Sequence, residues 1–145
     1  MDCQDDSTPK PIARVLVADD NELCRSVVVG IVEEMGCRVD AVGNGAAAVA
    51  AARKVRYDLI FLDGIMPEMN GIEAARAIRR IPGQRGRAPI VSITGNPMQI
   101  PKADCLEAGV NEYIQKPISR KVYRQAVARW VHGWPEPSSR PESSP

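Results

Sequence analysis

The sequence predicts one α/β domain: a doubly wound parallel sheet of five strands with helices on both faces. Five short apolar runs alternate along the chain with five segments of helical pattern, which is typical of strands joined by right-handed helical crossovers. The first, third and fourth runs are almost continuously apolar, as expected of central strands covered on both faces. The second and fifth runs alternate apolar and polar residues, which favours the edges of the sheet.

The expected elements follow one another in a regular order. Strands are expected at residues 14–18, 38–42, 59–62, 89–93 and 110–114. Helices are expected at residues 21–35, 45–55, 71–80, 98–108 and 119–132. Several expected helix ends carry a residue type that favours a helix start or stop. Asp20 or Asn21 can cap the first helix and Gly36 can end it, and Asn44 and Ser119 can cap the second and fifth helices.

Both ends of the chain differ in composition from the segment between them. Residues 1–11 are polar and contain two prolines, and residues 134–145 consist largely of Pro and Ser. Such segments cannot bury enough apolar surface to become ordered. We therefore expect disordered tails at 1–11 and 134–145 around a folded domain at 12–133, and 145 residues suit a single domain of this kind.

Charge and composition restrict the classes of partner and the compartment. A formal net charge of +1 gives no electrostatic reason to expect nucleic acid or a membrane surface as a direct partner. No apolar run is long enough to span a membrane, and the polar start of the chain is unlike a signal peptide. The four cysteines are scattered without metal-ligand spacing, as expected of free thiols in a reducing cytosol. These observations favour a cytoplasmic protein.

Five polar residues stand at the ends of four expected strands. Asp19 and Asp20 follow the first, Asp63 the third, Thr94 the fourth and Lys116 the fifth. Ligand sites of parallel α/β sheets lie outside the carboxyl ends of the strands, so we expect these side chains to share one concave site. Taken singly, each has an ordinary structural role as a helix cap, a turn residue, a local hydrogen-bond donor or a surface lysine. Their joint placement favours a functional site.

The chemistry of this set is that of a hard cation and a phosphoryl group. Three neighbouring carboxylates repel one another unless a cation lies among them, and an oxygen-only ligand set favours Mg²⁺, with Mn²⁺ as a possible substitute. A carboxylate can also act as a nucleophile toward phosphorus. Lys116 then supplies positive charge and Thr94 a hydroxyl to the phosphoryl oxygens. The set predicts a magnesium-dependent phosphoacceptor site.

These residues lie in motifs that resemble the receiver domain of two-component response regulators, the flavodoxin-like family of the chemotaxis regulator. The resemblance covers nearly the whole expected domain and rests on residues 15–21, 58–71, 90–96 and 112–117. It implies the strand order 2-1-3-4-5 and phosphorylation on Asp63. It also implies Mg²⁺ ligation by Asp20, Asp63 and the backbone carbonyl of Ile65, with Asp19 acting through water.

The resemblance further implies a conformational switch and partners. Thr94 and Tyr113 would shift together on phosphorylation, and the Lys116–Pro117 peptide is often cis in this family. Gly95 departs from the family pattern, which usually has alanine after the switch hydroxyl. Three shorter stretches are similar to receivers of hybrid histidine kinases, so the expected partner is a histidine kinase or a histidine-phosphotransfer protein, and the expected state is a monomer or weak dimer.

The first expected helix is apolar over about half its circumference, wider than the roughly 100° stripe of an ordinary surface helix. Either the fold buries this helix broadly, or part of the arc docks a partner. The docking hypothesis assigns Val28 or Val32 to the partner surface.

Other classes remain as alternatives. One is a receiver-shaped interaction module that is not phosphorylated, although such proteins typically lose an acidic ligand or the lysine. An aspartyl-nucleophile phosphatase would need a second carboxylate two residues after the nucleophile, where this chain has Ile65. The favoured interpretation is a phosphoacceptor that is not an enzyme acting on other substrates and that catalyses only its own phosphorylation and dephosphorylation.

Overall fold

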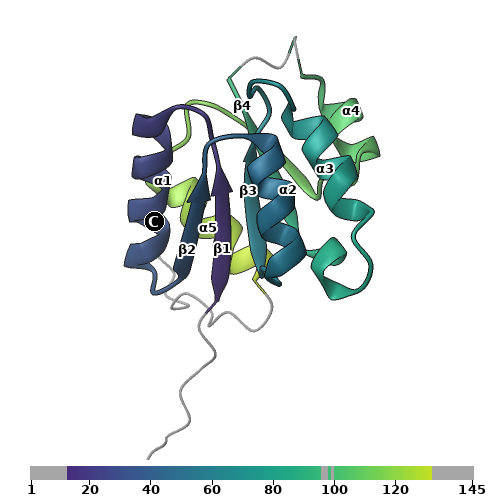
Figure 1. Ribbon diagram of the computed structural model, residues 1–145. Coiled ribbons are helices and arrows are strands. Elements are labelled where there is room, and N and C mark those ends of the chain that lie inside the picture. Colours follow the sequence, from purple (N-terminus) through teal and green to yellow (C-terminus); the bar gives the residue numbers. More distant parts are fainter. Residues whose placement is uncertain (1–12, 96–97, 99, 132–145) are drawn as a thin grey trace, which may run out of the picture.

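The computed structural model describes residues 13–95, 98 and 100–131, which form three layers with a parallel sheet in the middle (Figure 1). The strands are β1 (Arg14–Ala18), β2 (Arg38–Val42), β3 (Leu59–Asp63), β4 (Ile90–Thr94) and β5 (Glu112–Gln115). The helices are α1 (Glu22–Glu34), α2 (Gly45–Lys54), α3 (Gly71–Arg79), α4 (Lys102–Glu107) and α5 (Arg120–Trp130), with a short 3₁₀ helix η1 (Gln84–Arg87).

The strand order β2-β1-β3-β4-β5 confirms the predicted sheet, and all neighbouring strands pair in parallel. β2 and β5, which alternate polar and apolar residues, lie at the edges. Helices α1 and α5 cover one face of the sheet, and α2, α3 and α4 cover the other (Figure 1). No helix among residues 13–95 and 100–131 is both long and apolar enough to cross a bilayer.

Alternate residues of the central strands build two separate cores. Leu16 and Ile60 belong to the core beneath α2, α3 and α4, whereas Val17 and Phe61 belong to the core beneath α1 and α5. All four side chains are at most 2% exposed. A strand buried on both faces needs apolar residues at every position, and this requirement explains the unbroken apolar runs.

The helix ends follow the residues expected to cap them. Asn21, Asn44 and Ser119 are the N-caps of α1, α2 and α5, and each side chain accepts a hydrogen bond from a backbone N–H of the first turn. Gly36 follows α1 with a φ of 92°, a left-handed conformation that glycine adopts without steric cost. Asn70 and Glu73 form a capping box at α3 that was not predicted.

β1 and β2 have the expected bounds, the ends of the other strands and helices differ from the expectation by at most two residues, and α4 alone starts four residues later than expected. β3 and β4 each extend one residue farther, so that Asp63 and Thr94 are the last residues of their strands. α4 is shorter than expected because it starts after Pro101, and a residue that precedes proline avoids the helical region. Helix η1 was not expected. The predicted tails lie outside the described residues.

The docking hypothesis for Val28 and Val32 is wrong. Their side chains are 4% and 0% exposed, and both lie in the core between α1 and the sheet. The wide apolar arc of α1 exists because this helix packs on both the sheet and α5. The exposed part of the arc consists of Leu23 and Val27, which are 75% and 53% exposed.

Candidate phosphoacceptor site

The strand ends bring the predicted polar residues together. Carboxylate oxygens of Asp19, Asp20 and Asp63 lie within 4.8 Å of one another. The Lys116 Nζ lies 3.6 Å from Asp19 Oδ2 and 3.7 Å from Asp63 Oδ1. Thr94 ends the strand next to the one that ends at Asp63. The shared site expected from the sequence is therefore present.

Backbone contacts hold these strand ends in place. The Asp19 N–H donates to the Val42 carbonyl oxygen over 3.1 Å, and the Lys116 N–H donates to the Thr94 carbonyl oxygen over 2.7 Å. The Asp19 carboxylate accepts the Asn21 N–H over 2.9 Å, which fixes the side chain where the chain turns into α1. The acids are thus positioned by the sheet and by a helix start, both rigid elements.

The loop after β3 approaches the site closely at Gly71, whose importance the sequence analysis missed. A Cβ at Gly71 would lie 2.6 Å from the Asp63 carbonyl oxygen and 2.9 Å from the Gly64 Cα. The Gly71 N–H donates to the Gly64 carbonyl oxygen over 2.9 Å, which closes the loop. The glycine at the end of the 58–71 motif could have indicated this close approach, because glycine is commonly found where two backbone segments lie too close for a side chain.

Burial and charge repulsion perturb the central acid. The pKa of Asp63 is raised to about 6, chiefly by burial and next by the neighbouring Asp19 carboxylate, which acts as a charge and as a hydrogen-bond partner. The Lys116 ammonium and the Ile65 backbone N–H act in the opposite direction but do not offset the increase. A carboxylate that is hard to ionise beside another carboxylate indicates a site with too little positive charge.

The donor set fits a hard divalent cation. Three carboxylates face one another, two of them buried and Asp20 exposed, and no His or Cys belongs to the group. Oxygen donors with an open side suit Mg²⁺, which binds through one or two carboxylates and retains waters and phosphate oxygens. Ile65 lies in the loop after β3, and its N–H is directed at the Asp63 carboxylate.

The two residues of the expected switch lie on adjacent strands. Thr94 is fully buried at the end of β4, and Tyr113 lies on β5, two residues before the strand partner of Thr94. The Tyr113 hydroxyl donates to the Ile100 carbonyl oxygen over 2.8 Å. The Lys116–Pro117 peptide is cis, in agreement with the resemblance.

Comparisons with known proteins agree with this architecture. Residues 15–128 match the family described as the response regulator receiver domain. The chain is 39% identical over 120 residues to the sensor protein GacS of Pseudomonas syringae, covering 81% of this chain and 13% of that protein. It is 31% identical over 119 residues to the histidine-protein kinase BarA of Escherichia coli K12, covering 82% of this chain and 13% of that protein.

Solved structures show the same fold. The receiver domain of the sensor histidine kinase PA1611 from Pseudomonas aeruginosa, with a magnesium ion coordinated in its active site cleft, superposes with a TM-score of 0.76 at 33% identity, over 83% of this chain and 98% of that one. A chain from the co-crystal structure of the Saccharomyces cerevisiae phosphotransfer protein Ypd1 with the Ssk1 receiver domain superposes with a TM-score of 0.75 at 25% identity. The match covers 83% of this chain and 90% of that one.

The family match spans most of the sequence, and the sheet has the strand order that the resemblance implies. The three acids and Lys116 lie together at the carboxyl ends of the strands, where Thr94 ends β4. The chain spans 13% of the length of the curated relatives named above, which are much longer proteins. It belongs to the response regulator receiver domain family and is a receiver domain of a two-component or phosphorelay system.

Proposed function

We propose that Asp63 accepts a phosphoryl group from a phosphohistidine of a histidine kinase or a histidine-phosphotransfer protein, with Mg²⁺ as cofactor. The observation that carries this proposal is the convergence of Asp19, Asp20, Asp63 and Lys116 around one shared point. The co-crystal structure of Ypd1 with the Ssk1 receiver domain supports a phosphotransfer protein as the class of partner. Phosphorylation and its reversal on this residue are the only chemistry proposed for the domain.

The transfer replaces a P–N bond by a P–O bond. An ionised Asp63 oxygen attacks the phosphorus of the phosphohistidine, and the electron pair of the breaking P–N bond returns to the imidazole of the donor. Asp20, Asp63 and the Ile65 backbone carbonyl would hold Mg²⁺, and Asp19 would act on the ion through water. The ion would supply positive charge to the equatorial oxygens of the transferred group.

The chain's own residues stabilise the product. Lys116, whose Nζ already lies 3.7 Å from Asp63 Oδ1, pairs with the negative charge of the phosphoryl group. Thr94 donates its hydroxyl to a phosphoryl oxygen and is drawn toward the site, and Tyr113 adjusts beside it. Such a movement would carry the signal from the site to the surface formed by α4, β5 and α5.

The partner is proposed to dock over the site on the exposed part of α1, formed by Leu23 and Val27. These apolar side chains are 75% and 53% exposed, and α1 starts directly after Asp19 and Asp20. The variants Leu23→Asp and Val27→Asp should slow transfer from a phosphorylated histidine-phosphotransfer protein and leave labelling by a small acyl phosphate unchanged. Equal slowing of both reactions would exclude docking at these residues.

The main test is phosphotransfer to Asp63 itself. Wild type and Asp63→Asn are incubated with candidate histidine kinases and phosphotransfer proteins labelled at histidine, with and without magnesium. We expect the label to move to the wild type only, only with magnesium, and to be released by hydroxylamine. Transfer of equal label to Asp63→Asn would refute the proposal.

A further inference from the structure

Positive charge is concentrated at one end of the molecule although the net charge is only +1. Residues 53–56 and 76–87 contain eight of the 19 Lys and Arg residues and no Asp or Glu. These residues occupy the last turns of α2 and α3, the short segments that follow these two helices, and helix η1. The rest of the chain holds all 18 acids against 11 basic residues, so charge is strongly segregated.

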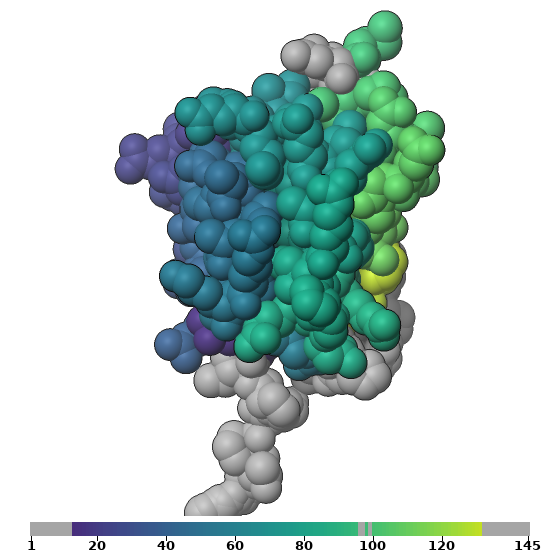
Figure 2. Space-filling view, turned by 45° about the vertical axis from the view of Figure 1, so that its right-hand side comes forward, coloured from purple at the N-terminus to yellow at the C-terminus, as the bar shows by residue number. Residues whose placement is uncertain are grey.

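The fold places this charge at the end of the sheet opposite to Asp63. In a parallel α/β sheet each helix runs back toward the amino ends of the strands, so the carboxyl ends of α2 and α3 lie away from the phosphoacceptor site. Figure 1 shows these helix ends and η1 at the base of the molecule, and Figure 2 looks onto the α2 and α3 side. The basic region is therefore separate from the site described above.

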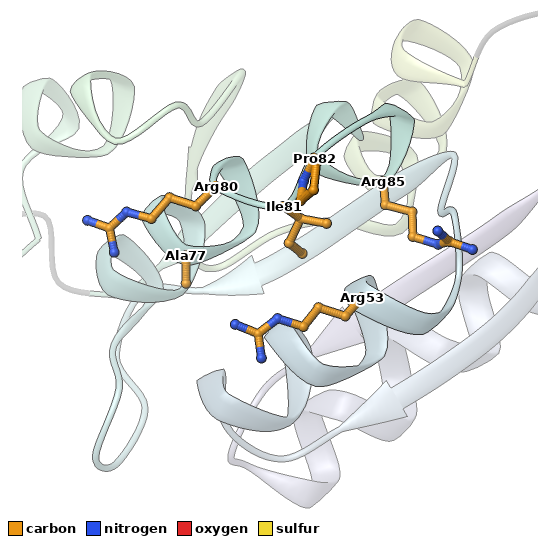
Figure 3. A pocket seen from close by; sticks show the side chains of 6 residues that line it. All are labelled: Arg53, Ala77, Arg80, Ile81, Pro82 and Arg85. Atoms are coloured by element: carbon orange, nitrogen blue, oxygen red, sulfur yellow. The ribbon is translucent and has the colours of Figure 1, made fainter.

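The surface there is hollowed. A pocket of about 400 Å³ is lined by three arginines, Arg53, Arg80 and Arg85, around the apolar residues Ala77, Ile81 and Pro82. In Figure 3 the guanidinium groups of Arg53 and Arg80 lie on one side of Ile81 and Pro82, and that of Arg85 lies on the other. A second hollow of about 400 Å³ shares Arg80 and is lined further by Arg76 and Arg79 of α3 and by Glu107 and Ala108 at the end of α4.

Helix electrostatics explain only part of this arrangement. Basic residues in the last turn of a helix interact favourably with its dipole, which accounts for Arg53 in α2 and Arg79 in α3. Arg79 is also engaged with the carbonyl oxygens of Gly86 and Ala88. Arg80, the C-cap of α3, also lies near the negative end of that dipole, but Arg85 lies in η1, where neither reason applies. Neither Arg80 nor Arg85 has an ion-pair partner among the described residues, and both line the pocket together with its apolar residues.

We propose that this arginine-walled pocket docks an acidic protein segment that carries an apolar side chain between its carboxylates. Guanidinium groups bind carboxylates in bidentate geometry, and arginine is favoured over lysine wherever such recognition matters. The floor of Ala77, Ile81 and Pro82 gives an apolar side chain a place to be buried. A nucleic acid backbone or a lipid headgroup would use the arginines and leave that floor uncovered, so the observed lining favours protein.

The proposal is tested with defined probes and the full chain. A fluorescein-labelled peptide of Glu-Glu-Leu repeats is titrated by fluorescence anisotropy, beside a peptide of Glu-Glu-Ser repeats, an oligo-dT of equal charge and phosphatidylserine vesicles. The double variant Arg80→Glu/Arg85→Glu is compared with Lys102→Glu/Lys121→Glu, which makes the same charge change at exposed residues outside the pocket. The double variant Arg80→Gln/Arg85→Gln is a second, milder test, because it removes the two positive charges without introducing negative ones.

We expect the Glu-Glu-Leu peptide to bind most tightly and to lose about tenfold or more in affinity in the pocket variants, as two lost charge-assisted hydrogen bonds imply. The control pair should bind like wild type, and phosphorylation of Asp63 should be unchanged in all variants. Equal binding of the serine peptide, tighter binding of oligo-dT or vesicles, or an equal loss in the control pair would each overturn the proposal.

Discussion

The replacement Asp63→Asn should stabilise the metal-free protein at neutral pH, although it removes the phosphoacceptor. The pKa of Asp63 is raised from 3.8 to about 6, chiefly by burial and then by the charge of Asp19. An upward shift of this size corresponds to about 3 kcal/mol of native-state penalty once the group is ionised. Asparagine has nearly the same shape without the charge. The asparagine amide is still desolvated and accepts a weaker hydrogen bond from the Ile65 N–H, so part of the penalty remains. We therefore expect the free energy of unfolding to rise by about 1–3 kcal/mol.

The gain should depend on pH with a defined sign. Between about pH 4 and the folded pKa of about 6, native Asp63 retains a proton that the unfolded chain has released. The native state then binds more protons than the unfolded state, so this residue lowers stability as the pH rises through that window. Below about pH 4 both states are protonated and the penalty is absent. The advantage of asparagine should therefore be full above pH 6 and disappear near pH 4.

Urea denaturation in EDTA, followed by circular dichroism at about pH 4 and about pH 7, measures the effect. Glu33→Gln removes one negative charge from an exposed position of α1 and serves as the matched control. It should change stability by no more than about 0.5 kcal/mol. If Asp63→Asn were no more stable than wild type at neutral pH, the inference of an undercompensated acid cluster would be refuted. Added magnesium should narrow the difference, because it stabilises the wild type.

Two further predictions concern the loop and the lysine. Gly71→Ala should lower the free energy of unfolding by about 1–3 kcal/mol in urea denaturation, because its Cβ would lie 2.6 Å from the Asp63 carbonyl oxygen. The matched change Gly30→Ala, on an exposed turn of α1 with nothing within 4 Å of the new Cβ, should raise it by about 0.5–1 kcal/mol, and equal effects would contradict the packing argument. Lys116→Ala should retain Mg²⁺ binding in isothermal titration calorimetry and lose stabilisation of the phosphorylated state, whereas lost metal binding would show that the lysine organises the acids.

Much of the fold could be predicted because the signals were local. The apolar runs at 59–62 and 89–93 can only be satisfied by strands covered on both faces, and Asn44 and Ser119 mark helix starts through their own side-chain bonds. The site was predictable for the same reason. Residues at the carboxyl ends of parallel strands must meet, whatever the details of packing.

The errors arose where tertiary packing decides. Val28 and Val32 remained candidates for a partner surface, beside the alternative of broad burial, because the sequence shows how wide the apolar arc of α1 is but not which part of it α5 covers. Helix η1 lies in a stretch rich in Gly, Pro and Arg that has no helical pattern. It is held by the Arg79 guanidinium, which reaches the carbonyl oxygen of Gly86, a contact that no local rule predicts.

The basic pocket shows a third limit. A net charge of +1 gave no electrostatic reason to expect nucleic acid or a membrane surface as a partner, and it gave no sign that the fold gathers Arg53, Arg80 and Arg85 around one hollow. Whole-chain charge is a sum and contains no information on placement. The positions of Arg53 and Arg80 at the carboxyl ends of two neighbouring helices could have been read from the sequence only once the helix boundaries were known, and Arg85 lies in η1, which was not expected.

The function proposed for this domain depends most directly on which residue is phosphorylated. The protein is treated with a small acyl phosphate and magnesium, reduced with borohydride to convert an aspartyl phosphate into homoserine, and digested for peptide mass spectrometry. We predict that the change occurs at Asp63 alone and only when magnesium is present. Modification at Asp19 or Asp20 in place of Asp63, or equal modification in EDTA, would contradict the assignment.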